Sequence, residues 1–216
     1  PLKILDHLEA SSGKNRTAYL ANEAKSFAEL TQTSQTKNLQ HVFFLHDNSK
    51  KMDYEGELKS VNQGAVVGAG TMGGGIAWLF AKNNQAPIMK DISPVGLELG
   101  LKQSSEVFFK AVKRKRMSQD EFERTQRSIS AQLDYTGFKK TDLVIEAVVE
   151  NMNVKKAVFT EVEKEVSRDC LLTSNTSSLS VNEMAKALEH SERFAGLHFF
   201  NPVHKMPLVE IIRHDN

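Results

Sequence analysis

The sequence of 216 residues contains one cysteine, lacks an initiator methionine and has no long apolar run. The single Cys170 excludes an internal disulfide and is consistent with a reducing compartment. Because it directly precedes Leu171 and Leu172, we expect a packed thiol rather than a nucleophile. No stretch reaches the roughly 18 apolar residues of a transmembrane helix. The chain starts at Pro1 without a signal-peptide pattern, and we expect an excised piece of a longer protein.

The chain also lacks a charge of predominant sign, since its formal net charge is +1. This balance gives no bulk electrostatic case for nucleic acid or an anionic membrane as a partner. The one basic cluster, Lys113–Arg116, lies in a helical pattern and is read as a solvated helix face. The alternative is a patch for an anionic ligand, such as the phosphates of coenzyme A. No Cys/His metal spacing and no G-x-S-x-G nucleophile motif occur, so no metal site is expected.

The first 59 residues differ in pattern from the rest of the chain. Residues 1–45 carry helical periodicity, which predicts two or three short helices broken near 11–13 and 31–34. Residues 47–60 are polar and charged and predict a linker. Because such helices have little core of their own, we interpret 1–59 as a helical connector that packs on neighbours.

From Val61 onward, short apolar segments alternate with helical patterns, which is typical of βαβ units. We therefore predict a second domain, 60–216, of the α/β class with a Rossmann-type, mostly parallel sheet. A helical hairpin insertion is expected over 95–130, turning near Met117 and Ser118, with Ser118 and Glu121 as a capping box. Ser93 and Pro94 predict its start. Strands are expected at 64–67, 86–89, 143–149, 171–174, 194–200 and 208–212, and further helices from about 71, over 153–166 and from about 181.

A glycine turn between the first strand and its helix predicts dinucleotide binding. Gly68, Gly70 and Gly73 form G-x-G-x-x-G, in which the first allows the turn, the second the approach of a pyrophosphate, and the third helix packing. The N-terminus of the helix near Thr71 would hold the phosphates. Asp91 follows 23 residues after Gly68, close to the spacing of a ribose-binding carboxylate.

Asp91 also indicates which dinucleotide binds. Its carboxylate repels a 2′-phosphate, and Ile92 stands where an NADP site often has arginine. The neighbouring Lys90 weakens this argument slightly. The sequence favours NAD over NADP.

A histidine and a glutamate near the C-terminus form the candidate acid–base pair. His198 lies in an apolar, strand-like run that ends in a turn, and Glu210 lies in the apolar segment LVEII, where burial is costly unless the carboxylate is paired. If the two strands pair around the 202–207 turn, Glu210 accepts from one ring nitrogen and leaves the other as a base. A buried ion pair or an edge carboxylate without catalytic role is the alternative.

Two further groups of polar residues follow predicted strands. The run SNTSS, which includes Ser177, stands at the carboxyl end of a strand, where its hydroxyls could bond a substrate oxygen or the nicotinamide. Simple capping of the next helix explains it equally well. Glu150 likewise ends a strand and could face a cofactor ribose, with Lys155 one turn into the next helix; alternatively both are ordinary surface charges.

Five motifs in order resemble one family. GAGTMGGGIA, then Asp91, DLVIEAVVEN, SNTSSL and GLHFFNPVHKMPLVEII are similar to the NAD-binding domain of L-3-hydroxyacyl-CoA dehydrogenases, over Val61 to Arg213. The leading helical segment and the last motif most resemble the multifunctional α subunits of bacterial fatty acid oxidation complexes. The resemblance implies NAD-dependent oxidation of L-3-hydroxyacyl-CoA to 3-oxoacyl-CoA in fatty acid β-oxidation.

The resemblance also assigns roles to residues. His198 would be the base that takes the 3-hydroxyl proton, Glu210 would orient it, and Ser177 would lie between substrate and nicotinamide. The residues implied to line the NAD site, besides the three glycines, are Met72, Asp91, Val148, Val149, Glu150, Lys155 and Asn201.

The same resemblance implies partners and missing parts. An enoyl-CoA hydratase domain, a lyase, would precede residue 1, and a helical C-terminal domain that supplies a catalytic asparagine would follow residue 216. A thiolase β subunit would be the partner in a cytoplasmic bacterial complex. We therefore expect this piece to fold and bind NAD but to oxidise 3-hydroxyacyl-CoA poorly. Two alternatives are another NAD-dependent hydroxyacid dehydrogenase and a non-catalytic nucleotide-binding or assembly module.

Overall fold

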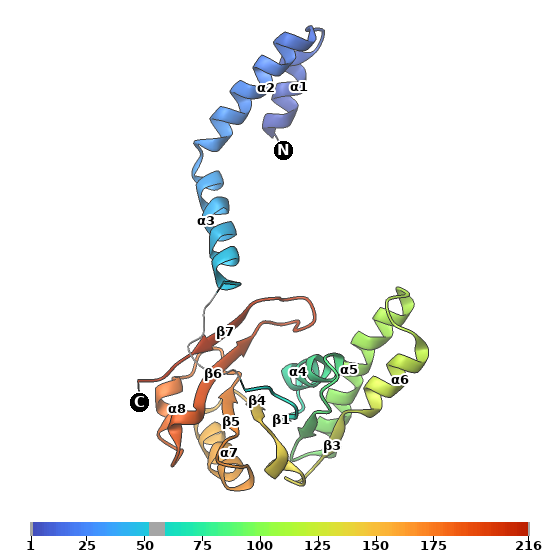
Figure 1. The fold of residues 1–216 in the computed structure, drawn as a ribbon, viewed down its shortest axis with the longest axis vertical. Coiled ribbons are helices and arrows are strands. Elements are labelled where there is room, and N and C mark those ends of the chain that lie inside the picture. The colour runs from blue at the N-terminus through green and yellow to red at the C-terminus, as the bar shows by residue number, and fades with distance from the viewer. Residues whose placement is uncertain (1, 52–58, 216) are drawn as a thin grey trace. The chain divides into compact units, whose positions relative to one another are not determined.

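A computed structural model describes residues 2–51 and 59–215 of the chain (Figure 1). The chain divides into two compact units, residues 1–59 and residues 60–216. The two units are described separately below.

The first unit consists of three helices, α1 (Leu2–Ser11), α2 (Arg16–Thr31) and α3 (Ser34–Ser49). The predicted breaks are confirmed. Side chains cap the second and third helices, since Asn15 accepts from the Ala18 amide and Thr33 from the Thr36 amide. Of the linker predicted over 47–60, the first residues belong to α3 and residues 52–58 lie outside the described part of the chain.

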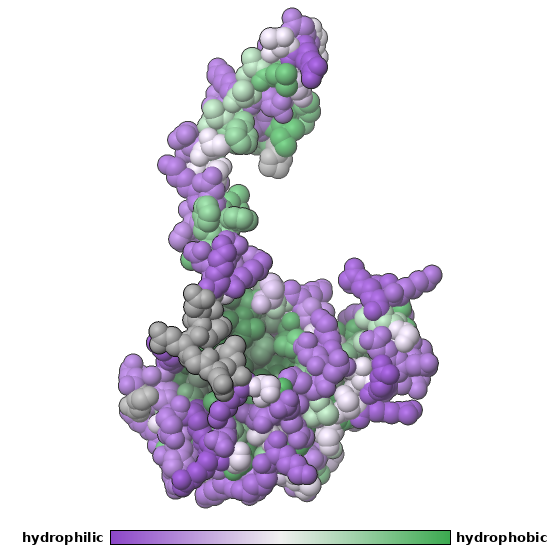
Figure 2. Space-filling model, in the orientation of Figure 1, coloured by the Kyte–Doolittle hydropathy of each residue, from purple (hydrophilic) through white to green (hydrophobic). Residues whose placement is uncertain are grey.

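This helical unit has little core of its own, as predicted. Among its described residues only Ser11 is buried. The green side chains along these helices in Figure 2 are therefore on the surface. The most exposed of the large apolar side chains are Leu2, Ile4, Phe27, Leu39 and Phe43.

The second unit is built on a seven-stranded sheet in the order β3-β2-β1-β4-β5-β6-β7. All neighbouring strands are parallel except β7, which runs antiparallel to β6 at one edge. The predicted mostly parallel α/β fold is thus confirmed. The strands are β1 (Gly64–Val67), β2 (Ile88–Lys90), β3 (Ser130–Gln132), β4 (Leu143–Glu146), β5 (Leu171–Ser174), β6 (Phe194–Phe199) and β7 (Val209–Ile212).

Helices cover both faces of this sheet. Alternate side chains of β1 enter different cores, with Ala65 and Val67 on the face of α7 and α8, and Val66 on the face of α4 and α5. Burial on both faces explains why β1 reads as a continuous apolar run. The helices are α4 (Thr71–Lys82), α5 (Pro94–Lys113), α6 (Gln119–Arg127), α7 (Met152–Glu165) and α8 (Val181–Ala185), with short 3₁₀ turns at Phe138–Lys140 and Ser191–Arg193.

The helical hairpin insertion is confirmed as α5 and α6. Ser118 caps α6 by accepting from the Glu121 amide. Pro94 is the first residue of α5, but the Ser93 side chain makes no capping bond. The basic cluster Lys113–Arg116 is exposed at the turn between the two helices, which is strongly hydrophilic in Figure 2.

Two strands differ from expectation. Ser130–Gln132 pairs with β2 as edge strand β3, which no β-branched or apolar run announced. Strand β4 ends at Glu146, before the predicted end at 149, because the chain turns there and the Val148 amide donates to the Glu146 carboxylate. Cys170 is fully buried, as predicted.

Within the described residues, no helix combines the length and the apolar character that crossing a membrane would need.

Candidate functional site

A cavity of about 690 Å³ opens at the carboxyl ends of β1, β2, β4, β5 and β6. This volume is in the range of small-molecule sites. The strand order reverses between β1 and β4, and open α/β sheets bind ligands at such a point. Its wall comprises Val67, Gly68, Gly70, Thr71, Met72, Lys90, Asp91, Ile92, Ala147, Val148, Val149, Glu150, Val154, Val158, Asn175, Ser177, His198, Phe199, Phe200 and Asn201.

The three positions of the turn require glycine for different structural reasons. Gly68 has φ +97°, and a Cβ there would lie 2.7 Å from the Ala147 carbonyl. A Cβ on Gly73 would lie 1.8 Å from the Gly68 oxygen. A Cβ on Gly70 would meet no protein atom within 4 Å, although Gly70 lines the cavity. The first and third glycines therefore serve the fold, whereas the second keeps space open for a ligand.

The turn leads directly into an anion-binding helix end. Gly70 is the N-cap residue of α4, and no side chain caps it. The first amides of a helix have no partner within the helix and favour negative charge. The cradle therefore fits the pyrophosphate of a dinucleotide.

Asp91 is fixed at the end of β2 before any ligand arrives. Its Oδ2 accepts from the Ala69 amide at 2.8 Å, and its Oδ1 accepts from the Ser93 amide at 2.9 Å. Each carboxylate oxygen keeps a second acceptor site. The carboxylate is thus placed to accept from a ribose hydroxyl, and the residues present fit NAD.

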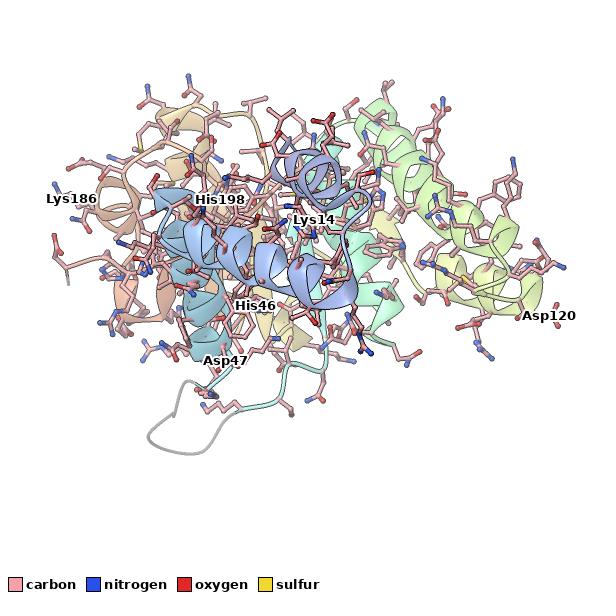
Figure 3. All side chains as sticks on the ribbon, turned by 90° about the horizontal axis from the view of Figure 1, so that it is seen from above. Lys14, His46, Asp47, Asp120, Lys186 and His198 are labelled. Carbon is pink, nitrogen blue, oxygen red and sulfur yellow. The ribbon has the colours of Figure 1, made fainter. Side chains whose placement is uncertain are left out.

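The predicted hydrogen bond between His198 and Glu210 is present. The two residues face each other in the β6–β7 register, and His198 Nδ1 lies 2.8 Å from Glu210 Oε2. An ionised carboxylate can only accept, so Nδ1 carries the proton and Nε2 of the neutral ring is left as a base. His198 lines the cavity, and in Figure 3 its label lies between those of Lys186, the C-cap residue of α8, and Asp120 on α6.

The reason given for this pairing was wrong in one respect. Glu210 is not a buried carboxylate, because its side chain is 50% exposed and β7 is an edge strand. Solvation, rather than pairing alone, makes the charge tolerable there. The His198 side chain is 17% exposed, so the ring is the more enclosed partner.

The 174–178 turn wraps around the Glu150 carboxylate. Glu150 Oε1 accepts from Thr176 Oγ1 at 2.6 Å, from the Ser177 amide at 3.0 Å and from the Ser178 amide at 3.2 Å. Helix α8 is capped instead by Ser180, which accepts from the Glu183 amide. Capping of α8 therefore does not account for the Ser177 hydroxyl, which is exposed on the cavity wall and lies 3.4 Å from Glu150 Oε1.

Glu150 stays ionised over a wide pH range. Burial alone would raise its pKa, but hydrogen bonds from Thr176 and Ser177 and the nearby Lys155 ammonium outweigh this and lower the pKa to about 2. The Lys155 Nζ is 3.2 Å from Glu150 Oε2. The cavity wall thus keeps a permanent negative charge at the end of β4.

This pKa predicts a pH-dependent part of the stability. In the unfolded chain Glu150 titrates near 4.5, so its contribution is complete above that pH and is lost as the pH falls toward 2. We expect the difference in unfolding free energy between wild type and Glu150→Gln to be constant from neutral pH down to about 5 and to shrink below it. Urea unfolding at a series of pH values measures it. A difference independent of pH would contradict the assignment.

Sequence reasoning missed a buried carboxylate that belongs to this site. Glu146 is fully buried, accepts from Lys155 Nζ at 2.7 Å, and lies behind the cavity wall. The available signal was a carboxylate inside the apolar strand LVIEAVV, the same cost of burial that was applied to Glu210. Lys155 itself is 1% exposed and is no ordinary surface charge.

The structure brings most of the predicted site residues onto one wall. Three predicted residues do not line the cavity but contact residues that do. Gly73 packs against Gly68, Lys155 pairs with Glu150, and Glu210 bonds to His198. In the described part of the chain no three metal-ligating side chains gather. The predicted residues on the wall are Gly68, Gly70, Met72, Asp91, Val148, Val149, Glu150, Ser177, His198 and Asn201.

Comparison with known proteins gives a consistent result. The family model described as 3-hydroxyacyl-CoA dehydrogenase, NAD binding domain, matches residues 63–216. A fatty acid oxidation complex subunit alpha from Acinetobacter baumannii is 44% identical over 215 residues, which are 99% of this chain but 30% of that protein. The chain thus spans less than a third of that relative.

Solved structures agree in fold and sequence. An (S)-3-hydroxybutyryl-CoA dehydrogenase from Ralstonia eutropha has a TM-score of 0.69 and 34% identity, over 72% of this chain and 55% of the other. A 3-hydroxybutyryl-CoA dehydrogenase from Escherichia coli K12 has a TM-score of 0.67 and 37% identity, over 71% and 32%.

Proposed function

Because this chain belongs to the 3-hydroxyacyl-CoA dehydrogenase family and contains its NAD-binding domain, we propose that, as part of the longer protein, it oxidises L-3-hydroxyacyl-CoA to 3-oxoacyl-CoA in fatty acid β-oxidation. The observation that carries the proposal is the His198 imidazole, held by Glu210 on the wall of a dinucleotide cavity. Oxidation of an alcohol needs a base for its proton and an acceptor for its hydride. This cavity provides a place for both.

Residues of four strand ends would hold the cofactor. Asp91 would accept from the adenosine ribose, the amides after Gly70 would bind the pyrophosphate, and Glu150 would face the second ribose. Bound NAD supplies a hydride acceptor. Met72, Val148, Val149 and Asn201 would complete the contact surface.

His198 would act on the substrate hydroxyl. Its Nε2 takes the proton from the 3-hydroxyl, and the ring becomes an imidazolium, which the Glu210 carboxylate stabilises through Nδ1–H. Glu210 also prevents the ring from presenting its other tautomer. The exposed Ser177 hydroxyl on the same wall would donate to the substrate oxygen.

The longer protein is part of the proposal. We place residues 1–59 as a helical connector between an enoyl-CoA hydratase domain and the dehydrogenase, which a helical C-terminal domain would complete. A thiolase β subunit would be the partner, and the complex would be cytoplasmic. These assignments are supported by similarity to a protein named as the α subunit of a fatty acid oxidation complex.

The direct test is formation of NADH at 340 nm by the natural full-length chain. We expect oxidation of L-3-hydroxyacyl-CoA with NAD⁺, none of the D isomer, and much slower oxidation with NADP⁺, because Asp91 repels a 2′-phosphate. Activity on a small hydroxy acid instead would favour a different dehydrogenase. No NADH with any substrate, despite NAD binding, would favour a non-catalytic module.

A further inference from the structure

A second carboxylate stands behind the cavity wall, on the last residue of β4. The Glu146 side chain is fully buried and its two oxygens accept from three donors. Oε1 accepts from the Val148 amide and from Lys155 Nζ, both at 2.7 Å, and Oε2 accepts from Ser174 Oγ at 2.6 Å. A buried charge persists only when paired and hydrogen-bonded, and this one is satisfied on both oxygens.

Through Lys155, Glu146 is connected to the cavity wall. The Lys155 ammonium lies between two carboxylates, 2.7 Å from Glu146 and 3.2 Å from Glu150. Lys155 is almost fully buried, so its position depends on these charged partners. If Glu146 had no charge, Glu150 would be the only carboxylate paired with the Lys155 ammonium.

Through Ser174, Glu146 is connected to the turn that carries Ser177. Ser174 Oγ donates to Glu146 and accepts from the Thr176 amide at 3.3 Å. Thr176 in turn donates to Glu150. Glu146 therefore fixes both the carboxylate and the serine turn from behind, while touching neither the cavity nor its contents.

The sheet separates this network from the adenosine end of the cavity. Asp91 follows β2, and Glu146 ends β4, two strand spacings or about 10 Å away. Ser177, in the turn after β5, and His198, on β6, lie still further along the sheet. The links through Lys155 and Ser174 thus lead toward the reactive half of the site.

We propose that Glu146 is a positioning residue for the nicotinamide half of the cofactor, acting through Lys155 and Ser174 on Glu150 and the Ser177 turn. The inference rests on the proposed assignment of these wall residues to NAD. Glu146 would not contact the cofactor itself, but it would determine the charge and the shape of the cavity wall that does.

The test compares two ligands on the natural full-length chain carrying Glu146→Gln. Glutamine keeps the size and one acceptor oxygen but removes the charge. Calorimetric titration should show NAD⁺ affinity falling by about tenfold, since charge-assisted bonds are lost. Affinity for ADP, which reaches only the Asp91 and α4 end, should stay within about twofold.

Glu163→Gln is the matched control. Glu163 is a nearly buried glutamate on α7, and its Oε1 lies 3.4 Å from Arg193, but it does not line the cavity. This variant should lose unfolding free energy without changing the affinity for either ligand. If Glu146→Gln does not fold, Ser174→Ala is the second variant, because it removes only the hydrogen bond from Ser174 to Glu146. It should weaken the affinity for NAD⁺ by a few-fold and leave the affinity for ADP unchanged.

The outcomes separate the inference from the proposed function. Equal losses for NAD⁺ and ADP would show a purely structural role and overturn the inference, as would no loss for either. A wild type that binds ADP but not NAD⁺ would also overturn it. NAD⁺ binding that depends on Glu146, in a chain without dehydrogenase activity, would contradict only the proposed function.

Discussion

Replacing His198 with glutamine is expected to lower kcat for L-3-hydroxyacyl-CoA oxidation by about 10²- to 10⁴-fold, the range for loss of a general base. Glutamine is close in size and keeps a hydrogen-bonding group toward Glu210, but it cannot accept the hydroxyl proton. NAD⁺ affinity should remain within about twofold, because the proposed role of His198 is to take a proton from the substrate and not to hold the cofactor. Initial rates at 340 nm and calorimetric NAD⁺ titration measure the two quantities.

His204→Gln provides the matched control for this experiment. His204 packs against Trp78, with ring centroids 6.0 Å apart, and does not line the cavity. The kcat of the His204→Gln variant should equal that of wild type. Glu210→Gln should give an intermediate loss, since the ring keeps a neutral partner but its imidazolium is no longer stabilised by a charge. Equal rates for wild type and His198→Gln would remove His198 from the mechanism.

A single methyl group in the glycine turn is expected to have opposite consequences at two positions. Gly70→Ala should fold with an unchanged melting temperature, because its Cβ meets no protein atom and its φ of −69° suits any residue. The methyl group would occupy the space where the pyrophosphate approaches. We expect NAD⁺ affinity to fall by at least about 100-fold, because the first backbone amides of α4 would no longer reach the pyrophosphate.

Gly73→Ala should instead destabilise the fold and lower the melting temperature. Its Cβ would lie 1.8 Å from the Gly68 oxygen, so α4 must move away from β1. Overpacking of this kind costs about 1–3 kcal/mol or more, and this contact involves rigid backbone. Thermal unfolding followed by circular dichroism distinguishes the two variants. A stable Gly73→Ala, or a Gly70→Ala that binds NAD⁺ normally, would contradict these assignments.

The order of the elements could be predicted because the signals were local. The glycine turn, the apolar strands and the Ser118 cap are each written in consecutive residues, and each is present. Strand β3 was missed because Ser130–Gln132 is short and becomes a strand only by pairing with β2. Its conformation comes from its neighbour in the sheet, not from its own residues.

The candidate site shows the same limit at longer range. Glu210 was paired with His198 correctly, although burial, the stated reason, does not apply to it. The argument from burial did apply to Glu146, which was overlooked. Its three donors come from Val148, Lys155 and Ser174, and no sequence spacing indicates that they converge.

The antiparallel last strand has a consequence for synthesis of the chain. The residues proposed to hold a dinucleotide, from Gly68 to Asn201, leave the ribosome before Glu210 does. The partner strands β6 (Phe194–Phe199) and β7 (Val209–Ile212) follow one another in the chain and are joined by one loop. In the order of synthesis, the proposed cofactor cradle therefore precedes the carboxylate that orients the base.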